Sequence, residues 1–541
     1  MSNFKKDERP HDGEDPNKPP RPISSSESTL ASKKIRTSAW ITLAVLGCTL
    51  LVTFYGETML LPAIRDIIGD FHISYSTSSW ILTAYLISGA VATPIAGKLS
   101  DIYGRKKMVL VIFIIYIIGI SIGGLSNNIT SLIVARVIQG IGISMFPIAF
   151  GIIRDQLPKE KLAIGVGVFS SMFAAGSVIG LALGGIIVKS FGWHATFLSI
   201  VPAAITLWVV INRVIRDSRD KSDTSEDREA EDANNSWKHP NIAKNAKSID
   251  IKGAVALAVT IASFLLALTY IGNNNHLDSF AQITVALLAM LSAGSLTSFI
   301  IVERKAASPL IELSLMTQKV LLPANIILLI LGITMFMVYQ TAPILVRSPQ
   351  PLGFGGDAVT TAMVQLPFMV VILIFAPSSG FIVSKIGNLK PTVAGTTIMT
   401  IGFFSLFMFH STEFIVAINL AIVAAGISLI QVGAFNITME YTPLRFSGVS
   451  LGMSVVLFLI GSSVGPAIAG IYMQTHQEIA KGVKGGGSFP SPLSYDLIFL
   501  TAAAISALSV LLVIILRRRI SQSDSKSKLG TETSNQKENM K

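Results

Sequence analysis

The sequence contains very little cysteine and little charge for its length. One cysteine, Cys48, occurs among 541 residues, so no disulfide can form within the chain. Charged residues make up 14% of the total and hydrophobic residues 51%, and the mean hydropathy is +0.61. These values exclude an ordinary soluble enzyme. The sequence also lacks a Walker loop, a nucleophile elbow and a metal-ligand spacing, so we expect no enzymatic chemistry, no cofactor and no metal.

Long apolar runs dominate the rest of the chain. A helix needs about 20 apolar residues to cross a bilayer, and fourteen stretches reach this length. They cover residues 38–62, 76–97, 107–125, 130–152, 162–188, 195–212, 251–272, 280–303, 320–343, 358–384, 390–411, 413–436, 445–472 and 494–516. The expected fold class is therefore an all-α integral membrane protein with fourteen spanning helices.

The positions of the basic residues predict how these helices are oriented. With the N-terminus inside, the inner loops carry Lys98, Arg105, Lys106, Lys107, Arg154, Lys159, Lys161, Arg304, Lys305, Lys319, Lys385, Lys390 and Arg445. The outer loops carry only Arg65, Lys189, Arg347, Lys481 and Lys484. This asymmetry follows the positive-inside rule, and an even number of spans places both termini in the cytoplasm. The net charge of +11 then reflects topology, and no nucleic-acid partner is expected.

Two patterns recur within the chain at nearly the same offset. The loop 97–107 contains two glycines, Asp101 and a basic end; residues 380–390 keep the glycines and the basic end but have Ser384 in place of the aspartate. A second set of glycines, spaced four residues apart, also occurs twice, at Gly176, Gly180 and Gly184 and again at Gly461 and Gly465, which Pro466 follows. Two unrelated patterns at one offset indicate an internal repeat of membrane bundles.

The repeat and the composition together predict the domain organisation. Helices 1–6 match helices 9–14, and helices 7 and 8 are an insertion between the two bundles. Segments rich in polar and charged residues cannot bury enough surface to order themselves. The expected parts are a disordered cytoplasmic tail at 1–37, a six-helix bundle at 38–212, a cytoplasmic charged linker at 213–250, the inserted helices 7–8 at 251–303, a second six-helix bundle at 320–516 and a disordered cytoplasmic tail at 517–541.

The loop 97–107 and the stretch from Ala135 to Gly142, which contains Arg136, Gln139 and Gly140, resemble two signatures of the major facilitator superfamily, in its fourteen-helix drug:proton antiporter group. The resemblance covers roughly residues 38–516. It implies the major facilitator fold, with two six-helix bundles plus an inserted two-helix hairpin, and secondary transport by alternating access.

The chain departs from this group at two places. The group usually has Gly-Pro in helix 5, where this chain has Gly180 followed by Leu181. The group often has an aspartate nine residues before the proline that ends helix 1; here that residue is Thr53, and Glu57 follows one turn later. These departures leave the fold untouched but bear on the claim of antiport.

Glu57 and Arg136 are the candidates for proton coupling. An ionisable group inside the bilayer costs roughly 2.5–3.5 kcal/mol on insertion scales, so it needs a partner or a task. At 1.5 Å per residue, both side chains lie roughly 8–9 Å below the outer face, so an ion pair is geometrically open to them. Glu57 would be the proton or cation site and Arg136 its competing counter-charge. The alternatives are a purely structural pair, or a glutamate that extends outward.

The loop 97–107 is the candidate gate at the cytoplasmic end. A carboxylate and a basic cluster suit a charged latch that closes the inner side and releases during the cycle, although Asp101 could equally cap the helix that follows. The gating candidates are Gly97, Asp101, Gly104, Arg105 and Lys106.

The substrate path follows from the repeat, because Gln340 occupies the position in helix 9 that Glu57 occupies in helix 1. By resemblance, these paired helices line the central cavity, although methionine and aromatic residues in membrane helices commonly face lipid or pack on neighbours. The candidates for substrate contact are Gln139, Met335, Tyr339, Gln340, Gln365 and Asn436. Gly176, Gly180, Gly184, Gly461, Gly465 and Pro466 are assigned to close helix packing, with a hinge as the alternative.

These observations favour efflux of lipophilic or cationic small molecules against inward-moving protons. The alternatives are a solute importer or facilitator of the same fold, and a membrane receptor that does not transport. The expected partners are a small-molecule substrate, protons and the lipid bilayer. We expect a monomer in the plasma membrane.

Overall fold

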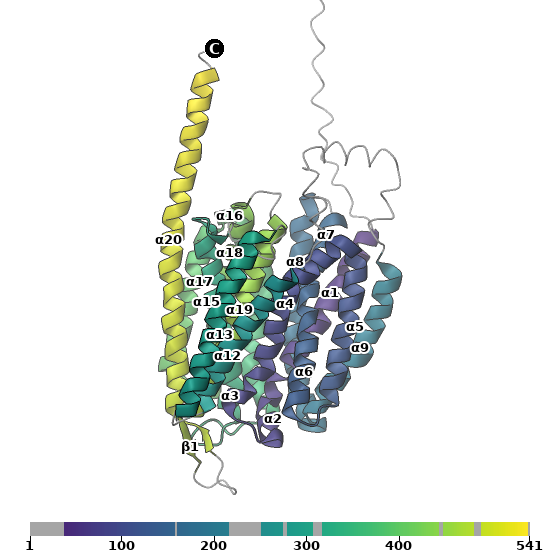
Figure 1. Ribbon diagram of the computed structural model, residues 1–541, viewed down its shortest axis with the longest axis vertical. Coiled ribbons are helices and arrows are strands. Elements are labelled where there is room, and N and C mark those ends of the chain that lie inside the picture. The colour runs from purple at the N-terminus through teal and green to yellow at the C-terminus, as the bar shows by residue number, and fades with distance from the viewer. Residues whose placement is uncertain are drawn as a thin grey trace, which may run out of the picture.

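The computed structural model describes residues 37–156, 159–215, 250–273, 279–306, 316–442, 447–480 and 488–538. Within these ranges, fourteen helices are long and apolar enough to cross a membrane, which confirms the number expected. The helices stand side by side, with a small β-hairpin at one end of the molecule (Figure 1). We call this end the hairpin face, and the opposite end, which carries Gly104, the loop face.

The first bundle is built from the first six spans. Its elements are α1 (Thr37–Thr58), η1 (Leu61–Ala63), α2 (Ile64–Phe71), α3 (Tyr75–Ser78), α4 (Trp80–Tyr103), α5 (Arg105–Gly124), α6 (Ile129–Gly140), η2 (Ile141–Ser144), α7 (Met145–Gln156), α8 (Lys159–Phe191) and α9 (Trp193–Val214). α1 with α2, and α6 with α7, each form one span that bends at a short 3-10 turn.

The second bundle follows the inserted pair of helices. The inserted pair is α12 (Ile251–Asn273) and α13 (Ser279–Lys305), and the bundle consists of α15 (Leu321–Arg347), α16 (Ala358–Ile386), α17 (Leu389–Met408), α18 (Glu413–Glu440), α19 (Ser447–Thr475) and α20 (Pro492–Glu538). Two short antiparallel strands, β1 (Gln477–Ile479) and β2 (Ser488–Pro490), connect α19 to α20, with Gln477 opposite Pro490.

The turns at the two repeated loops have the same backbone conformation. Gly104, between α4 and α5, has φ of 96°, and Gly387, between α16 and α17, has φ of 81°. In both turns the glycine N–H donates to the carbonyl four residues earlier, Ser100 at 3.0 Å and Val383 at 2.9 Å. Only glycine adopts this region without strain, which explains why both copies of the loop keep it.

The glycines spaced four residues apart allow close contact between helices. A Cβ atom on Gly176 would lie 2.3 Å from the carbonyl oxygen of Leu51, so α8 packs directly on the backbone of α1. Gly461 and Gly465 do the same for α19 on α15, where a Cβ would lie 2.1 Å from Leu329 O and 2.3 Å from Ile333 O respectively. Gly180 and Gly184 also face backbone atoms of α1, at 2.6 Å, and Pro466 lies inside α19.

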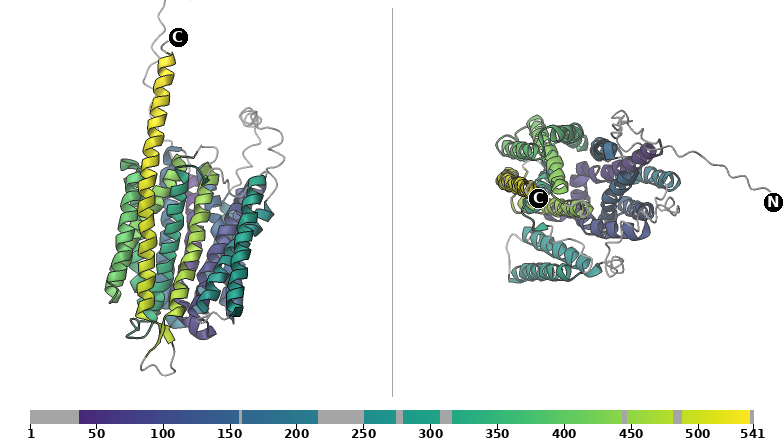
Figure 2. Two further views of the ribbon diagram at one scale, coloured as in Figure 1. Left: turned by 60° about the vertical axis from the view of Figure 1, so that its left-hand side comes forward. Right: turned by 90° about the horizontal axis from the view of Figure 1, so that it is seen from above.

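The inserted pair lies at the rim of the molecule. α12 contacts the first bundle through the indole N–H of Trp80, which donates to Thr269 Oγ1 at 2.8 Å. α13 packs on α12, where Ser292 Oγ donates to Thr260 O at 3.0 Å. Seen from above in Figure 2, the pair stands beside the two bundles, and only 6% of the apolar window of α13 is buried. α13 therefore presents most of its surface to lipid.

The C-terminal helix is longer than the sequence indicates. The composition of residues 517–541 favours a disordered tail, whereas α20 continues to Glu538 (Figure 1). No proline occurs after Pro492. Proline would interrupt the helical hydrogen bonds, so nothing of this type ends the helix beyond the membrane. The expected N-terminal tail at 1–37 and linker at 213–250 lie almost wholly outside the described residues.

Substituting Gly461 by alanine tests the packing of α19 on α15. The added Cβ would overlap the backbone of α15, and overpacking of this kind costs about 1–3 kcal/mol. We expect a lower thermal unfolding temperature for the purified protein in detergent. Gly294→Ala in α13 is the matched control, because a Cβ there meets no atom within 4 Å and it should leave the unfolding temperature unchanged or slightly raised. Equal effects of the two changes would contradict this account.

Candidate functional site

A buried polar cluster lies in the hairpin-face half of the first bundle. Arg136 and Gln139 on α6 are both 0% exposed, and Glu57 near the end of α1 is 5% exposed. Tyr85 from α4 and Tyr116 from α5 complete the cluster, and both are fully buried. Four helices thus direct polar side chains to one place in the bundle.

The guanidinium of Arg136 is held by three different kinds of partner. Its Nε donates to the carbonyl oxygen of Ile81 at 2.8 Å, and its Nη1 donates to Gln139 Oε1 at 2.8 Å. The ring of Tyr85 lies beneath it, with 4.5 Å between the guanidinium carbon and the ring centroid. Among the described residues Nη2 has no hydrogen-bond partner. Burial of an arginine requires such partners, because an unpaired charge in an apolar interior is very costly.

Glu57 and Arg136 belong to the same cluster. They do not form the direct ion pair that their equal depth in the membrane would allow. The part of the chain that the structure describes shows no ion pair between them, and Arg136 is committed to Ile81 and Gln139 instead. The two charges are still close enough to interact electrostatically. Arg136 Nη1 also donates to the carbonyl oxygen of Gly56 at 3.5 Å, so the guanidinium contacts the backbone of α1 beside Glu57 and not its carboxylate.

Gly56, which sequence analysis did not single out, creates the space for this cluster. A Cβ at this position would lie 2.3 Å from Tyr116 Oη and 3.0 Å from Gln139 Nε2. The hydroxyl of Tyr116 donates to Val52 O at 3.1 Å, and Gln139 Nε2 donates to Gly56 O at 3.4 Å. The cluster is therefore tied to the backbone of α1 at the turn that carries Glu57.

The candidates in the second bundle lie together, with one exception. Gln340 on α15 is fully buried and donates through Nε2 to Ser78 Oγ of the first bundle, at 3.5 Å. Gln365 on α16 donates to the carbonyl of Tyr339 at 3.3 Å. Asn436, in contrast, lies about 24 Å along α18 from Leu420 at 1.5 Å per residue. It is only half-buried, and the structure does not bring it to the other candidates.

Two small cavities flank the centre of the molecule. One lies inside the second bundle and is lined by Met335, Val338, Tyr339, Gln365, Phe368, Phe403, Leu420 and Val423. The other lies in the first bundle, on the side of Thr49, Thr53 and Phe146. Thr53 thus borders this cavity, one helical turn from Glu57.

The two bundles are joined by polar contacts at the hairpin face. Arg347 at the end of α15 makes a bidentate ion pair with Asp66 of α2, with Nη2 2.8 Å from Oδ1, and it also donates to Pro62 O at 3.0 Å. Lys189 at the end of α8 lies 2.7 Å from Asp357, which caps α16. Sequence analysis did not pair these residues; opposite charges at the outer ends of helices in different bundles were the available signal.

A further contact at the same face involves the β-hairpin. The guanidinium of Arg65 lies 4.8 Å from the ring centroid of Phe489 in β2, and the amide of Tyr75 donates to Gln474 Oε1 at 3.0 Å. Gly185 of α8 approaches α16 so closely that a Cβ would be 2.8 Å from Ala358 O. The bundles are therefore packed tightly against each other at this end.

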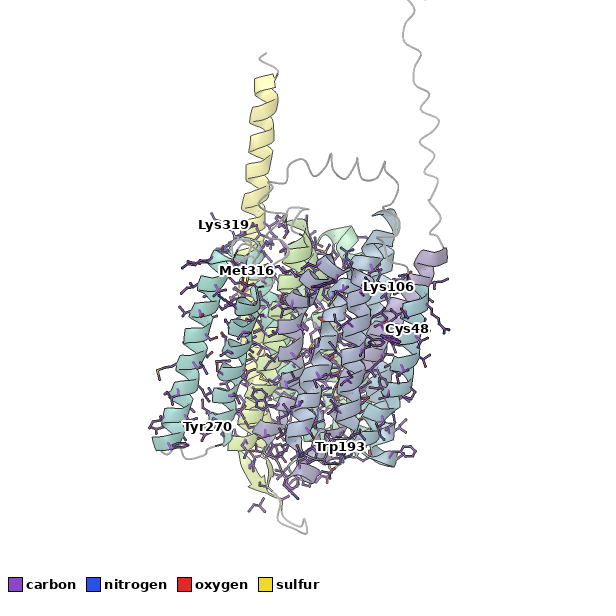
Figure 3. The ribbon with its side chains drawn as sticks, turned by 45° about the vertical axis from the view of Figure 1, so that its right-hand side comes forward. Cys48, Lys106, Trp193, Tyr270, Met316 and Lys319 are labelled. Carbon is purple, nitrogen blue, oxygen red and sulfur yellow. The ribbon has the colours of Figure 1, made fainter. Side chains whose placement is uncertain are left out.

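The loop face is different. Among the described residues, a Cβ on Gly97 or on its repeat Gly380 would meet no atom within 4 Å. Arg105 donates to Gly151 O at 3.0 Å, which links the loop to α7 within the first bundle. The side chain of Asp101 lies outside the described part of the structure. Lys106 and Lys319 lie towards this end, opposite Trp193 and Tyr270 (Figure 3).

Comparison with known proteins identifies the family. The model of the Major Facilitator Superfamily matches residues 46–466. The chain belongs to this superfamily. Its members carry solutes and are not enzymes, so this protein is a membrane transporter and not an enzyme, as the composition indicates. It is a multi-pass integral membrane protein.

Several curated relatives of this superfamily member have names that refer to drug resistance. It is 30% identical over 345 residues to Multidrug resistance protein 3 of Bacillus subtilis (strain 168), with 63% of this chain and 61% of the relative covered. It is 29% identical to Multidrug transporter protein MdtP of the same organism, with 69% and 64% covered. A third relative, 26% identical with 81% and 77% covered, is the Tetracenomycin C resistance and export protein of Streptomyces glaucescens. The matched part therefore spans less than two thirds of the length of the first two.

Solved structures show the same fold at low sequence identity. The xylose transporter XylE from E. coli superimposes with a TM-score of 0.57 at 12% identity, with 87% of this chain and 96% of that chain covered. The human organic anion transporter MFSD10 gives the same TM-score and identity, with 88% and 99% covered. The expected major facilitator fold is confirmed.

The close approach of Gly56 to Tyr116 predicts that a second substitution, at Tyr116, restores stability lost by a substitution at Gly56. Gly56→Ala should lower the unfolding temperature, because the new methyl group overlaps the tyrosine hydroxyl and overpacking costs about 1–3 kcal/mol. Tyr116→Phe alone removes one hydrogen bond and should cost only about 1 kcal/mol. The double variant should be more stable than Gly56→Ala, as measured by thermal unfolding in detergent. Purely additive losses would show that the hydroxyl is not the obstacle.

The Lys189–Asp357 pair should be insensitive to pH in the physiological range. The hydrogen bond from Lys189 and that from the Thr360 amide hold the pKa of the Asp357 carboxyl well below its usual range. A lowered pKa means that the stabilisation is complete above the usual aspartate pKa of about 3.9 and is lost only below it. Because the pair is partly exposed, Asp357→Asn should cost at most about 1 kcal/mol. That difference in unfolding temperature should stay constant from pH 5 to 8; a steady decline towards pH 5 would contradict it.

Proposed function

We propose that this transporter exports lipophilic or cationic small molecules in exchange for protons, by alternating access. The observation that carries the proposal is the environment of Glu57. It is 5% exposed, and within the described residues its carboxylate has neither a hydrogen bond nor a direct ion pair. An ionised carboxylate in such a place is expensive to maintain. It is stabilised by taking up a proton or by a bound cation.

These two ways of neutralising Glu57 exclude each other, and this provides the coupling. A proton on Glu57 removes the negative charge that attracts a cationic substrate. A bound cationic substrate neutralises the carboxylate, which then no longer needs a proton. Arg136 keeps its position through Ile81 and Gln139, so it is a fixed positive charge that favours release of the proton. Arg136 acts here as a counter-charge and not as a mobile partner.

The driving force is adequate for such an exchange. A proton that moves inward through a potential of about 100 mV releases roughly 2.3 kcal/mol. Each unit of pH difference adds about 1.4 kcal/mol. The curated relatives named for multidrug resistance and for export support efflux as the direction and a lipophilic substrate as the cargo.

The charge distribution supports placing the loop face in the cytoplasm, with both chain termini on that side, and the plasma membrane as the location. The ion pairs at the hairpin face would then close the outer side, and the open space at Gly97 and Gly380 would be the inner entrance. Asp101, Arg105 and Lys106 would form the latch that closes this entrance in the other half of the cycle. The transporter acts as a monomer in this scheme.

Proteoliposomes that contain a pH-sensitive dye test the proposal directly. Addition of rhodamine 6G, a lipophilic cation, should move protons across the membrane with the wild-type protein. Glu57→Gln should abolish this movement while the protein still folds and inserts. Glu478→Gln is the matched control, since Glu478 lies exposed on β1 and its loss should leave proton movement unchanged.

Two results would overturn the coupling mechanism. Substrate-driven proton movement that persists in Glu57→Gln would place the proton site elsewhere. Substrate transport without proton movement in the wild type would make the protein a facilitator, and Glu57 a structural residue.

A further inference from the structure

The two bundles carry different chemistry at matching positions. Asn128 and Thr412 begin the fourth helix of each bundle with the same cap, in which the side chain accepts from the amide of Ser131 at 2.8 Å and of Ile415 at 3.3 Å. Counting from these caps, Arg136 corresponds to Leu420 and Gln139 to Val423. The second bundle therefore has apolar residues where the first has its guanidinium and amide.

The second helix of each bundle shows the same replacement. Pro94 and Pro377 occupy matching places in α4 and α16, and with this register Tyr85 corresponds to Phe368. The ring that lies beneath Arg136 in the first bundle is thus matched by a ring without a hydroxyl group. Where the first bundle is filled by a polar cluster, the second bundle has a small cavity.

This cavity is lined almost entirely by apolar groups. Leu420, Val423, Phe368 and Phe403 supply aliphatic and aromatic surface, and Met335 supplies a thioether. The cavity is small. A methionine side chain is unbranched and adapts its shape readily, so the Met335 wall is the part that yields when a larger group enters.

One residue that lines this cavity, Gln365, has an amide oxygen without a hydrogen-bond partner among the described residues. Gln365 is 2% exposed and its Nε2 donates to the carbonyl of Tyr339. A carbonyl can only accept, so the amide nitrogen must face Tyr339 and Oε1 must face away. Among the described residues Oε1 has no hydrogen-bond partner, although Gln365 lines the cavity. Buried polar atoms are nearly always satisfied, and this one is available to a ligand that carries a donor.

Tyr339 connects the cavity to the cluster in the first bundle. Its ring lies 6.1 Å from that of Phe368, and the next residue, Gln340, donates to Ser78 Oγ of the first bundle at 3.5 Å. A ligand of moderate size can therefore present a positive charge to Glu57 and an aromatic edge to the cavity.

We propose that this cavity is the specificity subsite of the transporter, and that it takes the edge of an aromatic ring system bearing an N–H or O–H donor, which Gln365 Oε1 accepts. The proposal rests on the proposed function, since it assumes that an aromatic cation is the cargo. It adds that the second bundle distinguishes donor-bearing ligands from ligands of the same charge and shape that lack a donor.

A matched pair of dyes tests this subsite. Rhodamine 6G carries two secondary amine N–H groups on its xanthene ring, whereas tetramethylrhodamine ethyl ester has the same ring, ester and charge but no N–H. Binding of each dye to the purified full-length protein is measured by fluorescence polarisation, which does not require proton coupling. Gln365→Leu replaces the amide by an apolar side chain one atom shorter and removes the acceptor.

The expected result is selective. Gln365→Leu should raise the Kd for rhodamine 6G about tenfold, a loss of about 1.4 kcal/mol, and should change the Kd for tetramethylrhodamine ethyl ester less than about twofold. Leu420→Phe, which fills the cavity, should weaken both dyes. If Gln365→Leu cannot be purified in folded form, Gln365→Met removes the same acceptor.

The outcomes separate this inference from the proposed function. Wild-type protein that binds both dyes and couples them to protons, with no selective loss in Gln365→Leu, would refute the subsite and leave the function standing. Selective loss of rhodamine 6G binding without proton coupling in the wild type would support the subsite and refute the antiport. Absence of binding for both dyes would refute the ligand class, and the subsite with it.

Discussion

The cost of burying a charge among membrane helices shapes the first bundle. Arg136 has no exposed surface, and its guanidinium is stabilised by a backbone carbonyl of α4, a neighbouring amide and an aromatic ring. These partners belong to α4 and α6, Arg136 also donates to Gly56 O of α1, and Tyr116 joins α5 to α1, so the cluster connects all four helices. The glycine at position 56 and the tyrosine at 116 follow from this, since a larger residue at 56 would displace the amide that holds the arginine.

The second bundle has the same frame without this constraint. Its turns and close helix contacts repeat those of the first, including the left-handed glycine at 387 and the backbone contacts of Gly461. Its centre has leucine and valine where the arginine and glutamine would stand. At these matching positions one half of the molecule is therefore charged and polar, and the other is apolar. Duplication followed by divergence of the interior gives two different sites on one scaffold.

Much of the fold could be predicted from the sequence because the bilayer demands long apolar helices. The fourteen spans, the repeat of the glycine turn and the common depth of Glu57 and Arg136 all follow from counting residues. Tyr85 and Tyr116 were not predictable, since an aromatic residue in an apolar helix gives no indication of which neighbour it faces. The ion pair between Asp66 and Arg347 depends on which helix ends meet across the two bundles, which the sequence does not specify.

The number of inserted helices, two, determines the orientation of the second bundle. A single added helix would deliver the chain to the opposite side of the membrane, and the second bundle would then be inverted relative to the first. Two helices return the chain to the side from which it left, so the second bundle keeps its direction. Because α13 rests on α12 and borders lipid, the addition also leaves the surface between the bundles intact. An insertion of two helices at the rim therefore leaves the orientation of the second bundle relative to the first unchanged.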